Sequence, residues 1–338
     1  MSSENHPITS DLFQPVKIDE KGHKAISRNS LTYGQDAWLR LKKNKGALIG
    51  LMMISMIVIL AIVGPFLGGH SHVEQDLRRA NLPPKIPVLE NVSFLSFNGV
   101  DILGVDQYAK KGIDEYYWFG TDTLGRDLWA RTWQGTRISL CIAFLAAAID
   151  LIIGVLFGGI SGFYGGRIDN VMQRIIEILV GIPNLIVVIL FILILQPGIL
   201  SITLAMVITG WVGMARVVRG QILKLKEHEF VLAAKTLGAS NKRLLWKQLI
   251  PNVAGAIIIT TMFTIPSAIF TEAFLSFIGL GLRPPIASLG TIVNDGFKTM
   301  RIFPHMLIVS SVIISLIMIS FNIVGDGLRD ALDPRMRR

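Results

Sequence analysis

Long runs without charged side chains constrain the fold of this chain most strongly. They lie at Gly46–His70, Ile138–Ile149, Leu151–Gly166, Ile178–Ala215, Gln248–Thr271 and Ile302–Gly325. A helix needs about 20 apolar residues to cross a bilayer, and most of these runs reach that length alone or after joining across one charge. Only 17% of the 338 residues are charged, against about 25% in soluble domains. The chain is therefore predicted to be an all-α polytopic membrane protein, which excludes a soluble enzyme.

The run at Ile178–Ala215 is too long for a single span. Gln196-Pro197-Gly198 lies near its middle, and Pro-Gly is typical of a turn. We therefore expect two helices there and six transmembrane helices in total. Their predicted ranges are about 46–68, 138–163, 172–195, 199–217, 253–281 and 303–325.

Three other sequence features narrow the class. The first apolar run follows a polar tail, which is unlike a cleavable signal peptide with its short n-region. Cys141 is the only cysteine, so no disulfide and no cysteine-based metal site is possible within the chain. The net charge of +9 fits basic cytoplasmic loops better than binding of nucleic acid.

The distribution of Lys and Arg predicts the orientation. Two thirds of the 33 basic residues lie in segments 1–45, 164–174, 216–252 and 325–338, which the positive-inside rule places in the cytoplasm. We therefore expect a cytoplasmic tail with an interfacial helix (1–45), a first span (46–68) and an extracytoplasmic loop (69–137). A core (138–325) with a cytoplasmic loop (216–252) and a cytoplasmic tail (326–338) follow.

The outer loop, 69–137, carries several local signals. Asn98-Gly99 lies between two apolar runs, which favours a β-hairpin. Thr121 or Asp122 is expected to cap a helix that continues through Trp133. His70 and His72, with Glu74 nearby, are weak evidence for a metal site, and we predict none.

The basic segment Glu229–Asn252 lies between two apolar runs. Phe230, Ala233, Ala234 and Leu237 have the spacing of one helical face. Gly238 suits the left-handed position after a helix, and Ser240 can cap a second helix that ends at Pro251. The segment is thus predicted to be a pair of short helices, either on the membrane surface or docked to a soluble partner.

The same segment resembles the EAA loop of ATP-binding-cassette importer permeases. Ala233-Ala234, Gly238 and Pro251 fit the spacing of that pattern, whereas Leu232, Gln248 and Ile250 depart from it. Three further stretches resemble the oligopeptide, dipeptide and nickel permeases: FGTDTLGRDLWAR (Phe119–Arg131), FLSFIGLGLRPP (Phe274–Pro285) and GDGLRDALDPR (Gly325–Arg335). Ser288-Leu289-Gly290 departs from the acidic-Trp-Gly sequence of many members.

The resemblance implies a type I importer permease fold, in a bacterial inner or plasma membrane. It implies a homologous permease partner, two ATPase subunits that bind ATP and Mg, an extracytoplasmic binding protein and surrounding lipid. The loop residues implied to contact the ATPase are Glu229, Ala233, Ala234, Gly238, Ala239 and Ser240. The sequence has no GxxxxGK[ST] phosphate loop, so this chain is expected to bind no cofactor and to hydrolyse no ATP.

Two carboxylates fall inside predicted spans. An aspartate at a helix centre costs about 2.5–3.5 kcal/mol on insertion, which the apolar residues around Asp150 offset. Such residues usually face the bundle interior or water. Asp150 and Glu272 are therefore candidates for lining the pathway or for contacts between helices or subunits.

The leading functional hypothesis is an ATP-driven importer permease for oligopeptides. The long outer loop resembles oligopeptide permeases more than dipeptide or nickel permeases, which remain alternatives within the family. A secondary transporter driven by an ion gradient usually shows internal repeats, and we find none. A structural or channel protein would not need a docking loop, so co-purification of an ATPase separates these classes.

Overall fold

The computed structural model describes residues 33–87 and 97–332. Residues 1–32 of the predicted N-terminal segment, residues 88–96, and the end of the C-terminal motif at 333–338 lie outside this range. The described residues form helices and three isolated β-bridges. The helices are α1 (Tyr33–Lys43), α2 (Lys45–Leu67), α3 (Gln107–Lys111), α4 (Leu128–Tyr164), α5 (Gly166–Gly181), α6 (Asn184–Leu195), α7 (Ile199–Leu225), α8 (Glu229–Thr236), α9 (Asn241–Arg243), α10 (Ile250–Leu275), α11 (Leu289–Thr299) and α12 (His305–Leu332).

Five helical stretches are long and apolar enough to cross a membrane: α2, α4, α7, the run Asn241–Leu280 that contains α10, and α12. The pair α5 and α6, which is bent by 79°, gives a sixth crossing if it forms one span. The sequence predicted one continuous helix over 172–195. Pro183 precedes α6 and has no backbone N–H to continue the hydrogen bonding of α5, so the chain bends there instead.

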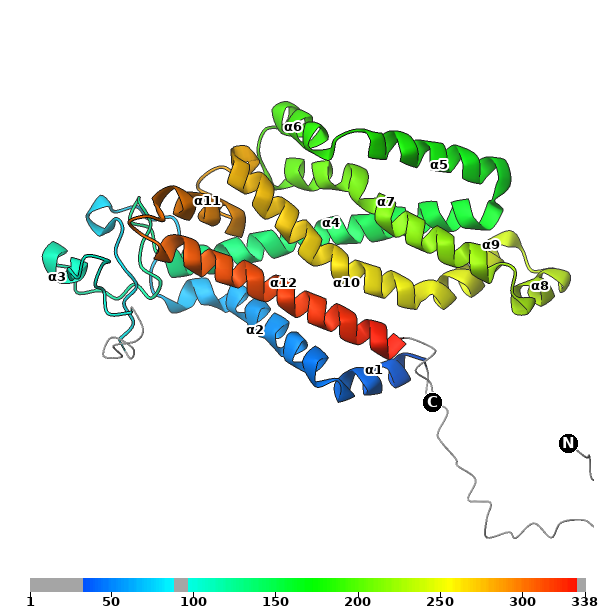
Figure 1. Cartoon of the computed structure of the whole chain (residues 1–338), viewed down its shortest axis with the longest axis horizontal. Helices are drawn as coiled ribbons and strands as arrows, with labels where there is room; N and C mark the ends of the chain where they lie inside the picture. The colour runs from blue at the N-terminus through cyan, green and yellow to red at the C-terminus, as the bar shows by residue number, and fades with distance from the viewer. Residues whose placement is uncertain (1–32, 88–96, 333–338) are drawn as a thin grey trace, which may run out of the picture.

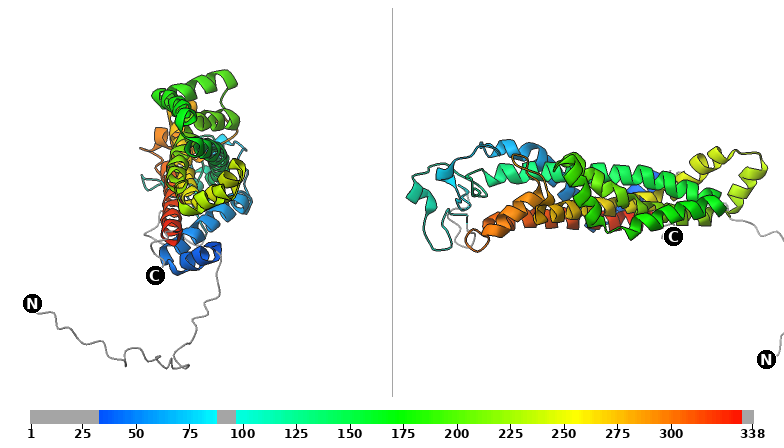
Figure 2. Two further views of the ribbon diagram at one scale, coloured as in Figure 1. Left: turned by 90° about the vertical axis from the view of Figure 1, so that its right-hand side faces the viewer. Right: turned by 90° about the horizontal axis from the view of Figure 1, so that it is seen from above.

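The long helices run side by side along the longest axis of the molecule (Figure 1). α1, α8 and the C-terminal end of α12 lie at one end, whereas α3 and the segment between α2 and α4 lie at the other. The views in Figure 2 show the same elongated bundle, with α8 projecting beyond it. The two ends of the bundle therefore carry the segments that the sequence assigned to opposite sides of the membrane.

Glycines on α4 bring its backbone against α7. A Cβ atom added to Gly158 would lie 2.3 Å from the carbonyl oxygen of Ala215, and one on Gly162 would lie 2.9 Å from that of Arg219. Gly154 faces Met214 in the same way. Since lipid offers no hydrophobic drive for helix association, such close backbone packing stabilises membrane bundles. Gly158 and Gly162 therefore allow the close packing of α4 against α7.

Two local predictions for the outer loop are wrong. Asn98 pairs with Lys85, and Val100 pairs with Asp106, so the described part shows no hairpin centred on Asn98-Gly99. Tyr108 packs closely on the Gly99 backbone, and these contacts outweigh the local turn signal. α4 starts later than predicted, because its cap is Asp127 rather than Thr121 or Asp122.

The α4–α7 contact predicts a sharp difference between two neighbouring glycines. Gly158→Ala forces a Cβ onto the Ala215 carbonyl, and such overpacking costs about 1–3 kcal/mol. Gly159→Ala meets its nearest atom at 3.5 Å, so it should be neutral or slightly stabilising. Thermal unfolding of the two purified variants measures this. Equal midpoints would contradict the tight α4–α7 contact.

The two-ended bundle predicts which exposed leucines are accessible from outside the cell. Leu103 is 81% exposed at the α3 end, and Leu237 is 87% exposed beside α8. In a Cys141→Ala background, Leu103→Cys should react with an impermeant thiol reagent in intact cells, and Leu237→Cys only after permeabilisation. Labelling of Leu237→Cys in sealed cells would contradict the predicted orientation.

Candidate functional site

The apolar face predicted for the cytoplasmic loop is exposed on α8. Phe230 and Leu237 are 42% and 87% exposed, and Ala233 is exposed as well. The opposite side of the helix attaches it to the bundle, because Val231 is buried with Leu244 and Leu245 in a cluster that also includes residues of α4 and α7. α8 thus presents an exposed apolar surface at Phe230, Ala233 and Leu237, while Ala234 packs against the buried cluster.

The turn after α8 has the geometry that the sequence predicted. Gly238 takes a left-handed conformation with φ +84°. Its N–H donates to the Lys235 carbonyl, and the N–H of Ala239 donates to the Ala234 carbonyl. Together these are the two hydrogen bonds of a Schellman motif. Ser240 then caps the next helix by accepting from the Arg243 N–H at 3.4 Å.

The second helix does not end at Pro251, contrary to the prediction. α9 continues through a π-helical turn, Leu244–Leu249, directly into α10. The wider π turn lies directly before Pro251. Proline has no backbone N–H to donate, and its ring clashes with the carbonyl four residues earlier in a regular α-helix. One continuous helical run, Asn241–Leu280, therefore connects the α8 turn to the middle of the bundle.

A cavity with both polar and apolar lining residues lies between α4, α6, α7 and α10. Its volume is about 350 Å³, within the roughly 300–1,000 Å³ typical of ligand pockets. The residues that line it are Ala146, Asp150, Asn184, Met206, Thr209, Gly210, Thr260, Phe263, Thr264, Ser267, Ala268 and Thr271. Ser267 and Gly210 are exposed, so the cavity opens on the surface of the chain.

Asp150 lies at the α4–α7 contact and also lines the cavity. It lies one helical turn before Gly154 on α4, at the end of the glycine contact with α7. At Asp150 the glycine of the contact is Gly210, on α7. A Cβ atom added to Gly210 would lie 2.6 Å from Asp150 Oδ2. The side chain is 6% exposed, lines the cavity, and its Oδ1 has no hydrogen-bond partner among the described residues.

Glu272 has a different environment from Asp150. It is fully buried within the chain and does not line the cavity. Ser139 of α4 donates to its Oε2 at 2.8 Å, and Ser276 donates to its Oε1 at 2.7 Å. Its carboxylate therefore joins α4 to α10, which is the helix contact considered for it.

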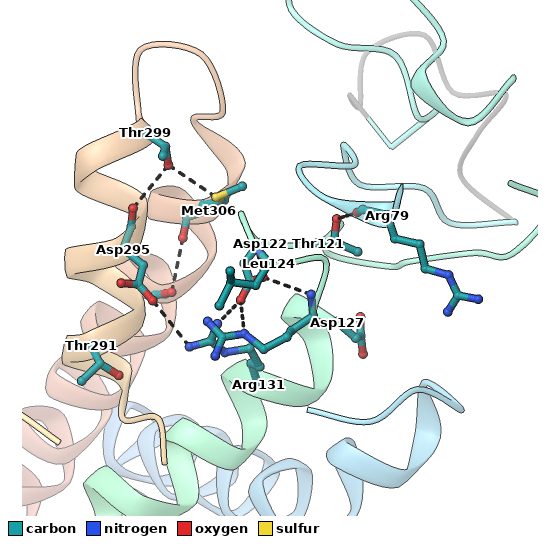
Figure 3. A network of polar contacts seen from close by, with 12 residues as sticks. Arg79, Thr121, Asp122, Leu124, Asp127, Arg131, Thr291, Asp295, Thr299 and Met306 are labelled. Carbon is teal, nitrogen blue, oxygen red and sulfur yellow. Dashed lines mark hydrogen bonds and ion pairs between the residues drawn. The ribbon is translucent and has the colours of Figure 1, made fainter. Parts of the chain in front are cut away.

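An ion-pair network at the outer end was not predicted from the sequence. Arg131, near the start of α4, contacts Asp122 and lies 3.5 Å from Asp295 of α11 (Figure 3). Arg126 Nε also lies 2.7 Å from Asp122 Oδ2. Asp122 and both arginines are buried. The FGTDTLGRDLWAR stretch thus fastens the outer loop to α4 and α11.

His70 and His72 do not form a metal-binding cluster with Glu74. The His70 ring stacks on Tyr117, with 4.3 Å between ring centroids, and its Nδ1 lies 3.9 Å from Glu115. Within residues 33–87 and 97–332, no group of three His, Cys, Asp or Glu side chains could hold a metal ion.

Two known protein families match this chain. Residues 154–338 match the family described as the binding-protein-dependent transport system inner membrane component. Residues 32–84 match the N-terminal TM domain of oligopeptide transport permease C. The chain belongs to this family of transport permeases.

Individual relatives of this permease cover nearly its whole length. The dipeptide transport system permease protein DppC of Bacillus subtilis is 46% identical, covering 99% of this chain and 100% of the relative. The oligopeptide transport system permease protein OppC of the same organism is 43% identical, covering 98% and 99%. A solved inward-facing MetNI methionine ABC transporter is 17% identical with a TM-score of 0.51, covering 60% of this chain and 96% of the solved chain.

These comparisons confirm the predicted class. The permease has the type I ABC importer fold and is a multi-pass transmembrane subunit of an ABC transporter. Its α8 lies in the segment that resembles the EAA loop, and the cavity lies among the membrane helices. The matches do not assign a role to Asp150, Glu272 or the α8 residues.

Burial of Asp127 predicts a pH dependence of permease stability. Asp127 caps α4 by accepting from the Ala130 N–H at 3.0 Å, and burial raises its pKa from 3.8 to about 6. The folded state therefore holds the proton more tightly than the unfolded state. This contribution to stability, roughly 3 kcal/mol, is present below about pH 4 and is lost as pH rises to about 6.

The test compares Asp127→Asn with the wild-type permease. Asparagine is an equally good N-cap and does not titrate. Wild-type thermal stability should fall relative to the variant between about pH 4 and pH 6, as measured by unfolding in detergent. Asp106→Asn, at the cap of α3, is the matched control. Parallel stability curves for wild type and Asp127→Asn would reject the prediction.

Proposed function

We propose that this permease is one half of the translocation pathway of an ATP-driven oligopeptide importer. It pairs with a homologous permease in a bacterial inner or plasma membrane, with both termini in the cytoplasm. Two ATPase subunits bind ATP and Mg and supply the energy. An extracytoplasmic binding protein delivers the peptide.

The exposed apolar face of α8 is the observation that carries this proposal. An apolar helix face at the water-exposed end of a membrane bundle is unfavourable unless a partner covers it. The charged residues around it, Glu229 and Lys235, suit the rim of a protein interface. The coupling residues Glu229, Ala233, Ala234, Gly238, Ala239 and Ser240 all lie on α8 or its turn, and we assign them to the ATPase contact.

The substrate class rests on the relatives. The match of residues 32–84 is to an oligopeptide permease domain, and the outer loop has the length that the sequence associated with oligopeptide permeases. A dipeptide importer is the second candidate, because the dipeptide permease of Bacillus subtilis is 46% identical to this chain. Nickel is the remaining alternative within the family.

Reconstitution tests the transport reaction directly. The complete complex is placed in vesicles with the binding protein outside and ATP on the ATPase side. Labelled tri- to hexapeptides should accumulate only with ATP, and more than dipeptides do. Uptake driven by an ion gradient without ATP would reject the mechanism. Uptake of dipeptides alone, or of nickel alone, would retain the mechanism and change the substrate.

A matched pair of leucine variants tests the α8 contact. Leu237 is among the most exposed large apolar side chains, so Leu237→Ser should not harm folding of the permease. It should reduce both co-purification of the ATPase subunits and ATP-driven uptake several-fold, because it removes apolar area from the interface. Leu103→Ser, equally exposed at the opposite end, should change neither. Full ATPase co-purification with Leu237→Ser would show that this face is not the docking surface.

A further inference from the structure

The four threonine hydroxyl groups around the cavity are oriented in a consistent way. Thr260, Thr264 and Thr271 each donate to a carbonyl of their own helix, at 2.8, 3.0 and 2.8 Å. Thr209 donates to Asn184 Oδ1 at 3.2 Å. A hydroxyl that donates its only hydrogen retains lone pairs for accepting. The threonine hydroxyls of the lining therefore offer acceptors to a ligand, whereas the Asn184 amide retains N–H donors.

Asp150 is the charged member of this lining. Its Oδ1 is buried and accepts no hydrogen bond from the described residues. Gly210 opposite it leaves no side chain between α7 and the carboxylate. An unpartnered carboxylate in the membrane region is costly, and a ligand with positive charge and several N–H donors would relieve that cost.

We propose that this cavity binds the α-ammonium group of the transported peptide at Asp150. The ammonium group has three donors and no acceptor, which matches a carboxylate beside threonine oxygens. The cavity is large enough for the end of a peptide and is open on the side where further residues of the peptide would extend. This proposal rests on the proposed function, and it adds a recognition site inside the membrane to whatever selection the binding protein makes.

The Glu272 site shows what a satisfied carboxylate looks like in the same bundle. There the hydroxyls of Ser139 and Ser276 turn toward the carboxylate and donate to it. At Asp150 the nearby threonine hydroxyls donate elsewhere. Both sites contain a carboxylate and side-chain hydroxyls. The direction of the hydroxyls therefore distinguishes a packing contact from a site that can bind a ligand with N–H donors.

The experiment measures peptide binding to the full permease–ATPase complex in nanodiscs, without the binding protein. The probes are trialanine with a fluorophore at its C-terminal end and the same peptide with an acetylated N-terminus. The wild-type complex should bind the free-amine probe at least about tenfold more tightly, as expected for a buried charge-assisted contact. Asp150→Asn should reduce this preference to about twofold or less by weakening only the free-amine probe.

Matched variants separate this site from a general effect of charge or folding. Glu177→Gln removes a carboxylate of α5 that is exposed and paired with Arg174, and it should bind like the wild type. Thr264→Val removes one hydrogen-bond acceptor of the cavity. It should reduce the preference for the free-amine probe over the acetylated probe several-fold. If Asp150→Asn does not assemble with the ATPase subunits, Thr264→Val decides, and an unchanged preference in that variant overturns the proposal.

Other outcomes are equally clear. Equal binding of the two probes by the wild-type complex, or equal weakening of both by Asp150→Asn, overturns the ammonium site. ATP-driven uptake of unlabelled trialanine by the same wild-type complex with its binding protein tests the proposed function separately. Uptake without any amine preference in the nanodisc assay would reject the ammonium site and leave the importer function standing.

Discussion

The close contact of α4 with α7 positions both the cavity and the base of the α8 loop. Gly154, Gly158 and Gly162 let the two backbones touch, and the same stripe continues to Asp150, where Gly210 supplies the small residue instead. Beyond Gly162, Asp169 of α5 binds Arg219 of α7 at 2.6 Å. One line of contact therefore fixes the cavity in the membrane and the base of α7 from which the α8 loop departs.

A single helical run, Asn241–Leu280, links the α8 loop to the cavity. α8 packs on the π-helical turn Leu244–Leu249 through Val231, and that turn continues into α10 without a break. Thr260, Thr264 and Thr271 of this run face the cavity. A displacement of α8 would thus reach the cavity wall through this helical run, because packed side chains and secondary elements can carry coupling between distant sites.

The sequence predicted the elements that depend on local composition. Apolar runs placed the spans, and Gly238 and Ser240 predicted the turn after α8, because bilayer thickness and capping act on neighbouring residues. Features set by distant contacts were missed. Contacts of Lys85 with Asn98 and of Tyr108 with Gly99 replace the predicted hairpin. Asp122 forms an ion pair with Arg131 instead of capping a helix. The bend before α6 had a local signal in Pro183 that a hydropathy pattern does not register.

The two intramembrane carboxylates show the limit of such reasoning most clearly. Insertion energetics treat Asp150 and Glu272 alike, since each costs about the same amount and each is offset by apolar neighbours. Their hydrogen-bonding environments depend instead on which hydrogens point at them, which is decided by helix rotation and register. Ser139 and Ser276 reach Glu272 from two helical elements, whereas the threonines of α10 bond to their own helix. Because threonine on a helix can satisfy its hydrogen internally, the same residue type can line a site without neutralising the charge at its centre.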